Sequence, residues 1–130
     1  MTLPTTRDAA LPTLTITPIN TAANSRGSIH DDEKAKEMGY KGGFIPGTTV
    51  LGYMSRLMQE TYGARWQAGS TFKGRLRRPL YEGAPATVTG AIIEDATPAN
   101  GNTVTVELKV IDGEGTVVAF AEATCKVQGG

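Results

Sequence analysis

The hydrophobic pattern of this chain has a helical period in its first half and a strand period in its second. Apolar residues recur at spacings of three and four over residues 48–61, which predicts a helix with one apolar face. A shorter helix is predicted over residues 32–38, where an aspartate can cap the start and Gly39 provides a C-terminal stop. Asp31 and Asp32 are both candidates for that cap, and we expect Asp32.

Strands are predicted on both sides of the helical region. Residues 14–17 alternate apolar and polar side chains and form the first strand. Four further strands are expected at residues 71–80, 87–94, 103–111 and 116–127. Short loops join the last strands, so we expect an antiparallel sheet, and the apolar face of the long helix must be buried against it. The pattern therefore predicts an α+β fold.

The length of 130 residues is enough for one domain with its own core. Residues 1–12 are rich in Thr, Ala and Pro and show no periodicity, so we expect a flexible N-terminal arm. Residues 13–130 then form a single domain.

The charge balance narrows the range of partners. Lys plus Arg and Asp plus Glu each number 13, which argues against nucleic acid or an anionic membrane as the main partner. The single cysteine allows no intrachain disulfide, and no apolar stretch has the length of a signal peptide or a membrane span. We therefore predict a cytoplasmic location. There is no metal-ligand spacing and no phosphate-binding loop, so no metal or cofactor is expected.

Two positions near the helices could carry chemistry. His30 is the only histidine and stands just before the short helix, where an imidazole could transfer protons near neutral pH. Its alternative role is to cap that helix or to pack in the loop. Gly47 opens the long helix, whose free N–H groups could bind a developing oxyanion. The alternative is an ordinary helix start, with Thr48 or Thr49 as its cap.

A basic run occupies one predicted strand. It comprises Lys73, Arg75, Arg77 and Arg78. Alternation along a strand would place Arg75 and Arg77 on one face and Arg78 on the other. These side chains could contact the phosphates of coenzyme A or a carboxylate. A solvated strand edge is the alternative interpretation.

Several stretches of the chain resemble the signature of the MaoC-like hydratases. The matching positions are Ile29-His30-Asp31-Asp32, Ala35, Gly39-Tyr40, Ile45-Pro46-Gly47 and the segment from Phe72 to Gly83 that ends in Pro, an aromatic residue and Gly. Over roughly residues 14–127, the resemblance implies the hot-dog fold, a strongly curved antiparallel sheet wrapped round one long helix. It also implies a lyase that adds or removes water at the 2,3-bond of an acyl thioester or a related carbonyl compound. His30 would transfer the proton, and Gly47 would bind the oxyanion.

The chain departs from that signature at important positions. Ser25 stands where the family has its catalytic aspartate, Gly27 replaces the family asparagine, and Pro46 replaces a second histidine. Asn24 and Ser25 could still hold a water or bind a polar substrate group. With Thr48, Tyr53 and Arg77, they are the predicted substrate-binding residues.

The resemblance implies an acyl thioester substrate, linked to coenzyme A or a carrier protein. It also implies a homodimer with its site at the junction of the two sheets. Two other functions remain open: an isomerase or cyclase that uses His30 alone, and a non-catalytic acyl- or small-ligand-binding protein. An acyl thioesterase is disfavoured, because the long helix lacks an evident catalytic carboxylate and Glu60 is expected to face solvent.

Overall fold

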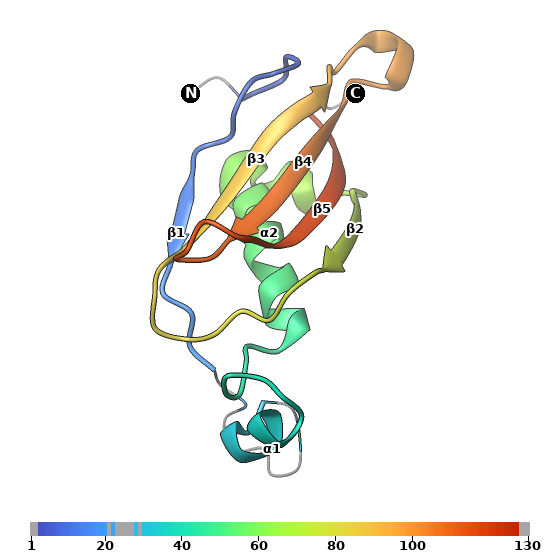
Figure 1. The fold of residues 1–130 in the computed structure, drawn as a ribbon. Helices are drawn as coiled ribbons and strands as arrows, with labels where there is room; N and C mark the ends of the chain where they lie inside the picture. Colours follow the sequence, from blue (N-terminus) through green and yellow to red (C-terminus); the bar gives the residue numbers. More distant parts are fainter. Residues whose placement is uncertain (1–2, 21, 23–27, 29, 128–130) are drawn as a thin grey trace.

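The computed structural model describes residues 3–20, 22, 28 and 30–127. Its five strands form one antiparallel sheet in the order β1-β3-β4-β5-β2 (Figure 1). The elements are β1 (Leu14–Ile16), α1 (Asp32–Glu37), α2 (Gly47–Tyr62), α3 (Ala64–Gln67), β2 (Thr71–Leu76), β3 (Ala86–Glu94), the short 3₁₀ helix η1 (Pro98–Asn100), β4 (Thr103–Ile111) and β5 (Val117–Lys126).

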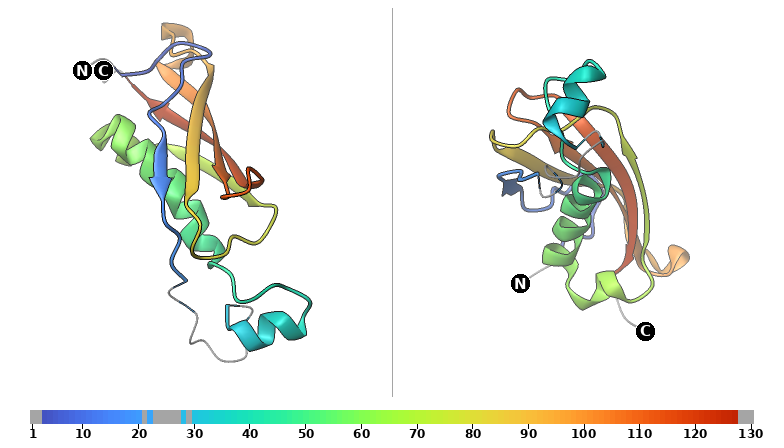
Figure 2. Two further views of the ribbon diagram at one scale, coloured as in Figure 1. Left: turned by 60° about the vertical axis from the view of Figure 1, so that its left-hand side comes forward. Right: turned by 90° about the horizontal axis from the view of Figure 1, so that it is seen from below.

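Helix α2 packs across the concave face of the sheet, which curves round it (Figure 2). Its buried residues Met54, Leu57 and Met58 follow the predicted spacing of three and four. Full burial of each such side chain contributes about 1.5–3 kcal/mol. The facing side chains of β4 are every second residue, Val104, Val106, Leu108 and Val110. The predicted α+β hot-dog architecture is therefore confirmed.

Small side chains let α2 lie close to the strands on one side of the sheet. The buried positions of β5 carry Ala119, Ala121, Ala123 and Cys125. On the neighbouring strand β2, a Cβ added to Gly74 would lie 2.5 Å from Leu51 Cδ2 of the helix. This close packing fixes the start of α2 against the end of β2.

The described part of the N-terminal segment lies along β3. The N–H groups of Asp8 and Leu11 donate to the carbonyl oxygens of Ile92 and Gly90, at 2.9 and 2.8 Å. The side chain of Leu11 joins the core with 3% of its surface exposed. The sequence did not predict these contacts, since residues 1–12 carry no periodic pattern. The division of the chain at residue 12 stays a prediction.

Strand β2 is shorter than predicted. It ends at Leu76, after which the N–H groups of Arg77 and Arg78 both donate to the carbonyl oxygen of Val118, at 2.8 and 3.1 Å. Two successive donors on one acceptor break the regular ladder, so the strand does not continue to Leu80 as predicted. Arg75 and Arg77 still lie on one side, since Arg75 is the cross-strand partner of Phe120 and Arg77 lies over the same ring. Among the described residues, no helix has both the length and the apolar character needed to cross a membrane.

The cap of α1 also differs from the prediction. The side chain of Asp31, not that of Asp32, accepts from the N–H of Lys34 at the start of the helix. Asp32 is the first helical residue, and its Oδ1 accepts from the N–H of Gly43 at 2.7 Å. A contact eleven residues along the chain therefore decides which aspartate caps the helix.

Candidate functional site

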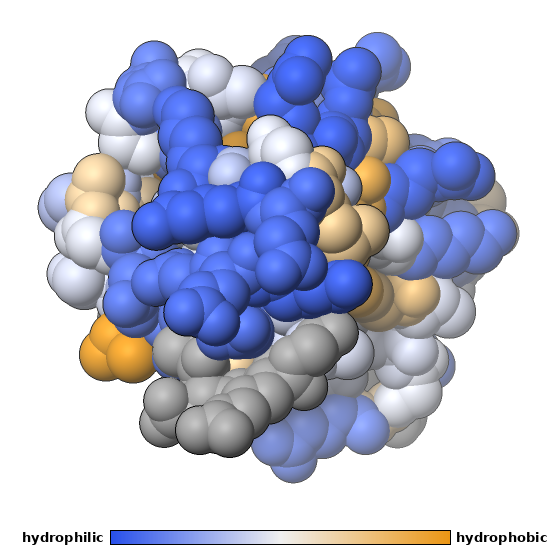
Figure 3. Space-filling model, turned by 60° about the horizontal axis from the view of Figure 1, so that its bottom comes forward, coloured by the Kyte–Doolittle hydropathy of each residue, from blue (hydrophilic) through white to orange (hydrophobic). Residues whose placement is uncertain are grey.

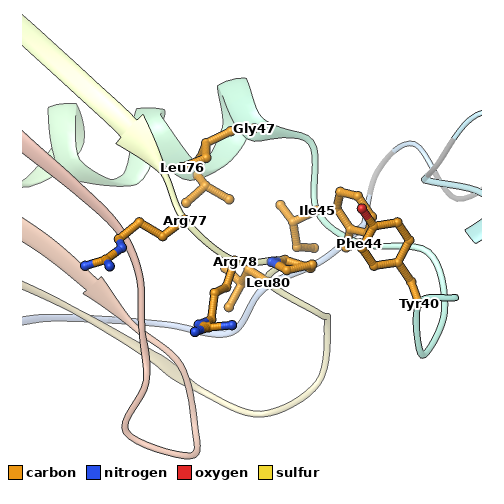
Figure 4. Close-up of a pocket in the computed structure, with 10 residues that line it drawn as sticks. Tyr40, Phe44, Ile45, Gly47, Leu76, Arg77, Arg78 and Leu80 are labelled. Atoms are coloured by element: carbon orange, nitrogen blue, oxygen red, sulfur yellow. The ribbon is translucent and has the colours of Figure 1, made fainter. Parts of the chain in front are cut away.

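A cavity of about 210 Å³ lies at the start of α2 (Figure 4). Three segments meet round it: the connector between α1 and α2, the first turn of α2, and the chain that follows β2. Its lining residues are Tyr40, Phe44, Ile45, Gly47, Val50, Leu76, Arg77, Arg78, Pro79 and Leu80. The surface of this end of the molecule is mostly hydrophilic where the charged helix α1 lies (Figure 3).

Gly47 opens α2 without a side-chain cap. Pro46 occupies the N-cap position and has no polar side-chain atom, so the predicted caps Thr48 and Thr49 are wrong. The N–H groups of Thr49 and Val50 donate to the carbonyl oxygen of Pro46, at 3.0 and 3.2 Å. Those of Gly47 and Thr48 meet no acceptor among the described residues. Of these two backbone donors, that of Gly47 belongs to a residue that lines the cavity, and that of Thr48 is the next along the helix start.

The side chain of Leu76 lies against Gly47. A Cβ added to Gly47 would lie 2.3 Å from Leu76 Cδ1. Leu76 packs over the first turn of α2, yet 51% of its surface is exposed. An apolar wall therefore flanks the donors of the helix start.

His30 lies behind Phe44 and does not itself line the cavity. Its Nδ1 is 2.8 Å from the carbonyl oxygen of Phe44. A carbonyl oxygen can only accept, so we assign the proton to Nδ1, which leaves a lone pair on Nε2 of the neutral ring. The two rings also meet edge to face, with 5.6 Å between their centroids.

Three residues that were not among the predicted site residues hold His30 in place. Asn20 is buried, and its Nδ2 donates to the carbonyl oxygen of His30 at 2.8 Å. The peptide of Gly43 lies so close that an added Cβ would be 2.1 Å from the same oxygen. Asp32 holds that peptide through the Gly43 N–H. The adjacent glycines 42 and 43 were the only local signal of this close approach.

An aromatic cluster surrounds Phe44. Its ring meets Tyr40 and Tyr81 edge to face, with centroids 5.0 and 6.3 Å apart. Edge-to-face pairs of this kind are worth about 0.5–1.5 kcal/mol beyond the area they bury. The cluster forms the wall between His30 and the cavity.

The predicted site residues fall into three groups. Gly47 and Arg77 line the cavity, and His30 contacts its wall. Thr48 is exposed beside Gly47. Tyr53 packs against the core and does not line the cavity. Its burial raises the pKa of its hydroxyl. The remaining two, Asn24 and Ser25, lie outside the described residues.

The guanidinium of Arg77 also has a partner of its own. Its Cζ lies 5.8 Å from the centroid of the Phe120 ring, at the side of the cavity away from Tyr40 and Phe44 (Figure 4). In the part of the chain that the structure describes, no three His, Cys, Asp or Glu side chains gather as metal ligands would. The described residues at the cavity and its wall supply backbone donors, one imidazole and two arginines.

Comparison with known proteins gives structural matches only. No protein-family model and no curated protein matches the chain. Among solved structures, the (R)-hydratase from A. caviae involved in PHA biosynthesis is 16% identical over 95% of this chain and 97% of that one, with a TM-score of 0.74. A MaoC-like dehydratase is 20% identical over 95% of this chain and 41% of that one, with a TM-score of 0.78.

A hot-dog protein of another activity class is also similar. A predicted thioesterase from Bacillus stearothermophilus is 16% identical over 93% of this chain and 81% of that one, with a TM-score of 0.61. One fold thus accompanies different chemistry in these proteins. The strand order, the curvature round α2 and these likenesses show that the chain has the hot-dog fold, in the form found in MaoC-like dehydratases and (R)-hydratases.

Proposed function

We propose that the protein is a hydratase or dehydratase acting at the 2,3-bond of an acyl thioester or a related carbonyl substrate. The observation that carries this proposal is the pair of N–H groups at Gly47 and Thr48, which meet no acceptor in the described part of the chain. They lie at the edge of a mainly apolar cavity, and His30 contacts the wall of that cavity through Phe44. Backbone donors in this position can stabilise the negative charge that forms on a carbonyl oxygen.

The reaction can be written with one histidine. In the dehydration direction, Nε2 of His30 takes the proton from carbon 2 while the carbonyl oxygen accepts from the helix start. The imidazolium then gives that proton to the hydroxyl leaving carbon 3, so water departs and the double bond forms. His30 returns to its neutral form, and no further proton donor is needed. For this transfer, Phe44 must move enough to let the substrate reach Nε2.

The thioester would be linked to coenzyme A or a carrier protein, and the active form would be a cytoplasmic homodimer.

The dimer would form through β2, an edge strand that pairs only with β5 among the described residues. A second copy could pair with its open side and extend the sheet. The exposed side chain of Leu76 at the cavity would then be covered. Light scattering at micromolar concentration should give the mass of a dimer, and a monomer would count against this assembly.

The test is an assay for the hydration of crotonyl-coenzyme A. The reaction is monitored through the absorbance of the conjugated enoyl thioester, which is lost when water adds to the double bond. We expect His30→Ala to lower the rate by about 100- to 10,000-fold, the usual contribution of general acid–base catalysis. Glu114→Gln, an exposed substitution in the β4–β5 hairpin, is the matched control and should leave the rate unchanged. An equal rate in the His30→Ala protein would refute the role of His30.

A binding protein is the second candidate, because Phe44 rather than His30 lines the cavity. Ligand-induced thermal stabilisation without turnover would favour it, and His30→Ala would then spare the binding. A thioesterase is disfavoured by α2. The only carboxylate of that helix, Glu60, is exposed and paired with Arg56 at 3.4 Å.

A further inference from the structure

The charged groups that line the cavity in the described part of the chain are all of one sign. Arg77 and Arg78 are the only charged residues among its described lining, which includes no carboxylate. The ion pairs of the described residues involve Lys34, Arg56 and Lys109 instead. The two arginines therefore have no acidic partner within the described ranges, and they stand at an otherwise apolar and aromatic cavity.

The arrangement of the lining gives the cavity two different ends. Tyr40 and Phe44 lie at one side and the two arginines at the other, with Ile45 between them (Figure 4). Because both arginine N–H groups bind the Val118 carbonyl, the ladder ends here and the two side chains are not forced onto opposite faces of a strand. A ligand with one anionic end and one apolar end matches this polarity.

We propose that the cavity takes an acyl group that bears a carboxylate of its own, bound by Arg78 together with Arg77. This inference rests on the proposed function, since it treats the cavity as the acyl site. A guanidinium is suited to a carboxylate because its N–H groups can donate two parallel hydrogen bonds. Arg77 can turn from the ring of Phe120, a contact at the sheet surface that costs little to leave.

The size of the cavity indicates which anion the arginines bind, a carboxylate of the acyl group or the phosphates of coenzyme A. Gly47 and both arginines border the same 210 Å³. A thioester carbonyl placed at Gly47 is separated from the coenzyme's pyrophosphate by the whole pantetheine arm, which such a volume does not hold. An anionic group that reaches the arginines from within the cavity therefore belongs to the acyl part.

Binding tests the proposal without turnover. The probes are the N-acetylcysteamine thioesters of glutaric acid, with one free carboxylate, and of butyric acid, and neither carries a phosphate. By calorimetry, we expect the glutaryl thioester to bind about 2- to 5-fold more tightly, the usual effect of an ion pair to an arginine that is exposed to solvent. Arg78→Gln should remove this preference, Arg77→Gln should reduce it, and Arg65→Gln on the exposed face of α3 should retain it.

The outcomes separate this inference from the hydratase reaction. If the glutaryl preference is present and depends on Arg78, the inference stands even where crotonyl-coenzyme A is not hydrated. Equal binding of the two thioesters would overturn it. A second result would also overturn it. If the Arg77 and Arg78 variants bound the coenzyme A thioesters of both acids equally more weakly but bound the N-acetylcysteamine thioesters as before, the arginines would be binding the phosphates of coenzyme A.

Discussion

His30 owes its position to backbone contacts that leave no space for a side chain at residue 43. The carbonyl oxygen of His30 accepts from buried Asn20, and the peptide of Gly43 packs against that same oxygen. The ring is then oriented by the carbonyl of Phe44. The side chain that could perform chemistry is thus held by groups that are not themselves reactive.

Gly43→Ala should therefore disturb the site more than its size suggests. The added Cβ would meet backbone atoms of His30, which cannot rotate away. We expect a loss of about 1–3 kcal/mol in the free energy of unfolding, typical of overpacking, and a loss of ligand binding. Gly52→Ala is the matched control, because an added Cβ there meets no atom within 4 Å and a helical alanine gains up to about 1 kcal/mol. Urea denaturation measures both, and equal stabilities would contradict the steric argument.

At the scale of elements, α1 and the connector after it act as one unit. Asp31 caps the helix, and Asp32, one residue later, holds the Gly43 peptide against His30. The short helix therefore places an aspartate where it supports the site, although α1 buries only Ala35.

The two aspartates should have separable effects. Asp31→Ala should lower stability by about 1 kcal/mol, as the loss of a helix cap usually does, and should spare ligand binding. Asp32→Ala should weaken binding, because the Gly43 N–H loses its acceptor, whereas Asp32→Asn should largely restore it through the amide oxygen. Denaturation and thermal-shift titration of the three variants give the comparison. If Asp31→Ala weakens binding as much as Asp32→Ala, the division of roles is wrong.

At the scale of the whole molecule, the core encloses groups that resist ionisation. Burial raises the pKa of the Cys125 thiol, with smaller opposing effects from Ser70 and Arg65. Burial also raises the pKa of the Tyr62 hydroxyl, and the charge on Cys125 adds to the rise. Both groups lie where α2 and α3 pack against the sheet, so their protonation is coupled to the folded state.

Stability should consequently fall at alkaline pH. The ordinary pKa of a cysteine thiol, 9.0, applies to the unfolded chain. Below that pH, the thiol and the hydroxyl keep their protons in both the folded and the unfolded protein, so neither group makes stability depend on pH. Above it, the unfolded chain loses protons that the folded protein retains, first at Cys125 and then, above 10.0, at Tyr62. The free energy of unfolding therefore decreases as pH rises. Denaturation between pH 7 and 11 measures this, and Cys125→Ala should remove the earlier part of the decrease.

Local pattern was enough for most of the architecture. The 3.6-residue spacing of Met54, Leu57 and Met58 and the alternation of residues 103–111 depend only on which face each residue presents. The order of these elements and their short loops then restricted the sheet to antiparallel pairing. The hot-dog arrangement came from the resemblance to the MaoC-like hydratases, and the structure confirms it.

Only the tertiary structure decided the details of the site. Asp31 and Asp32 are equivalent as caps in the sequence, and the Gly43 peptide, distant along the chain, distinguishes them. Likewise, β2 ends at Leu76, just before Arg77, where one carbonyl of β5 accepts two successive donors. Local sequence determines the period of an element, since that period arises from its own backbone geometry. It does not determine which polar group meets a given hydrogen-bond partner, because such contacts form only when separate segments pack together.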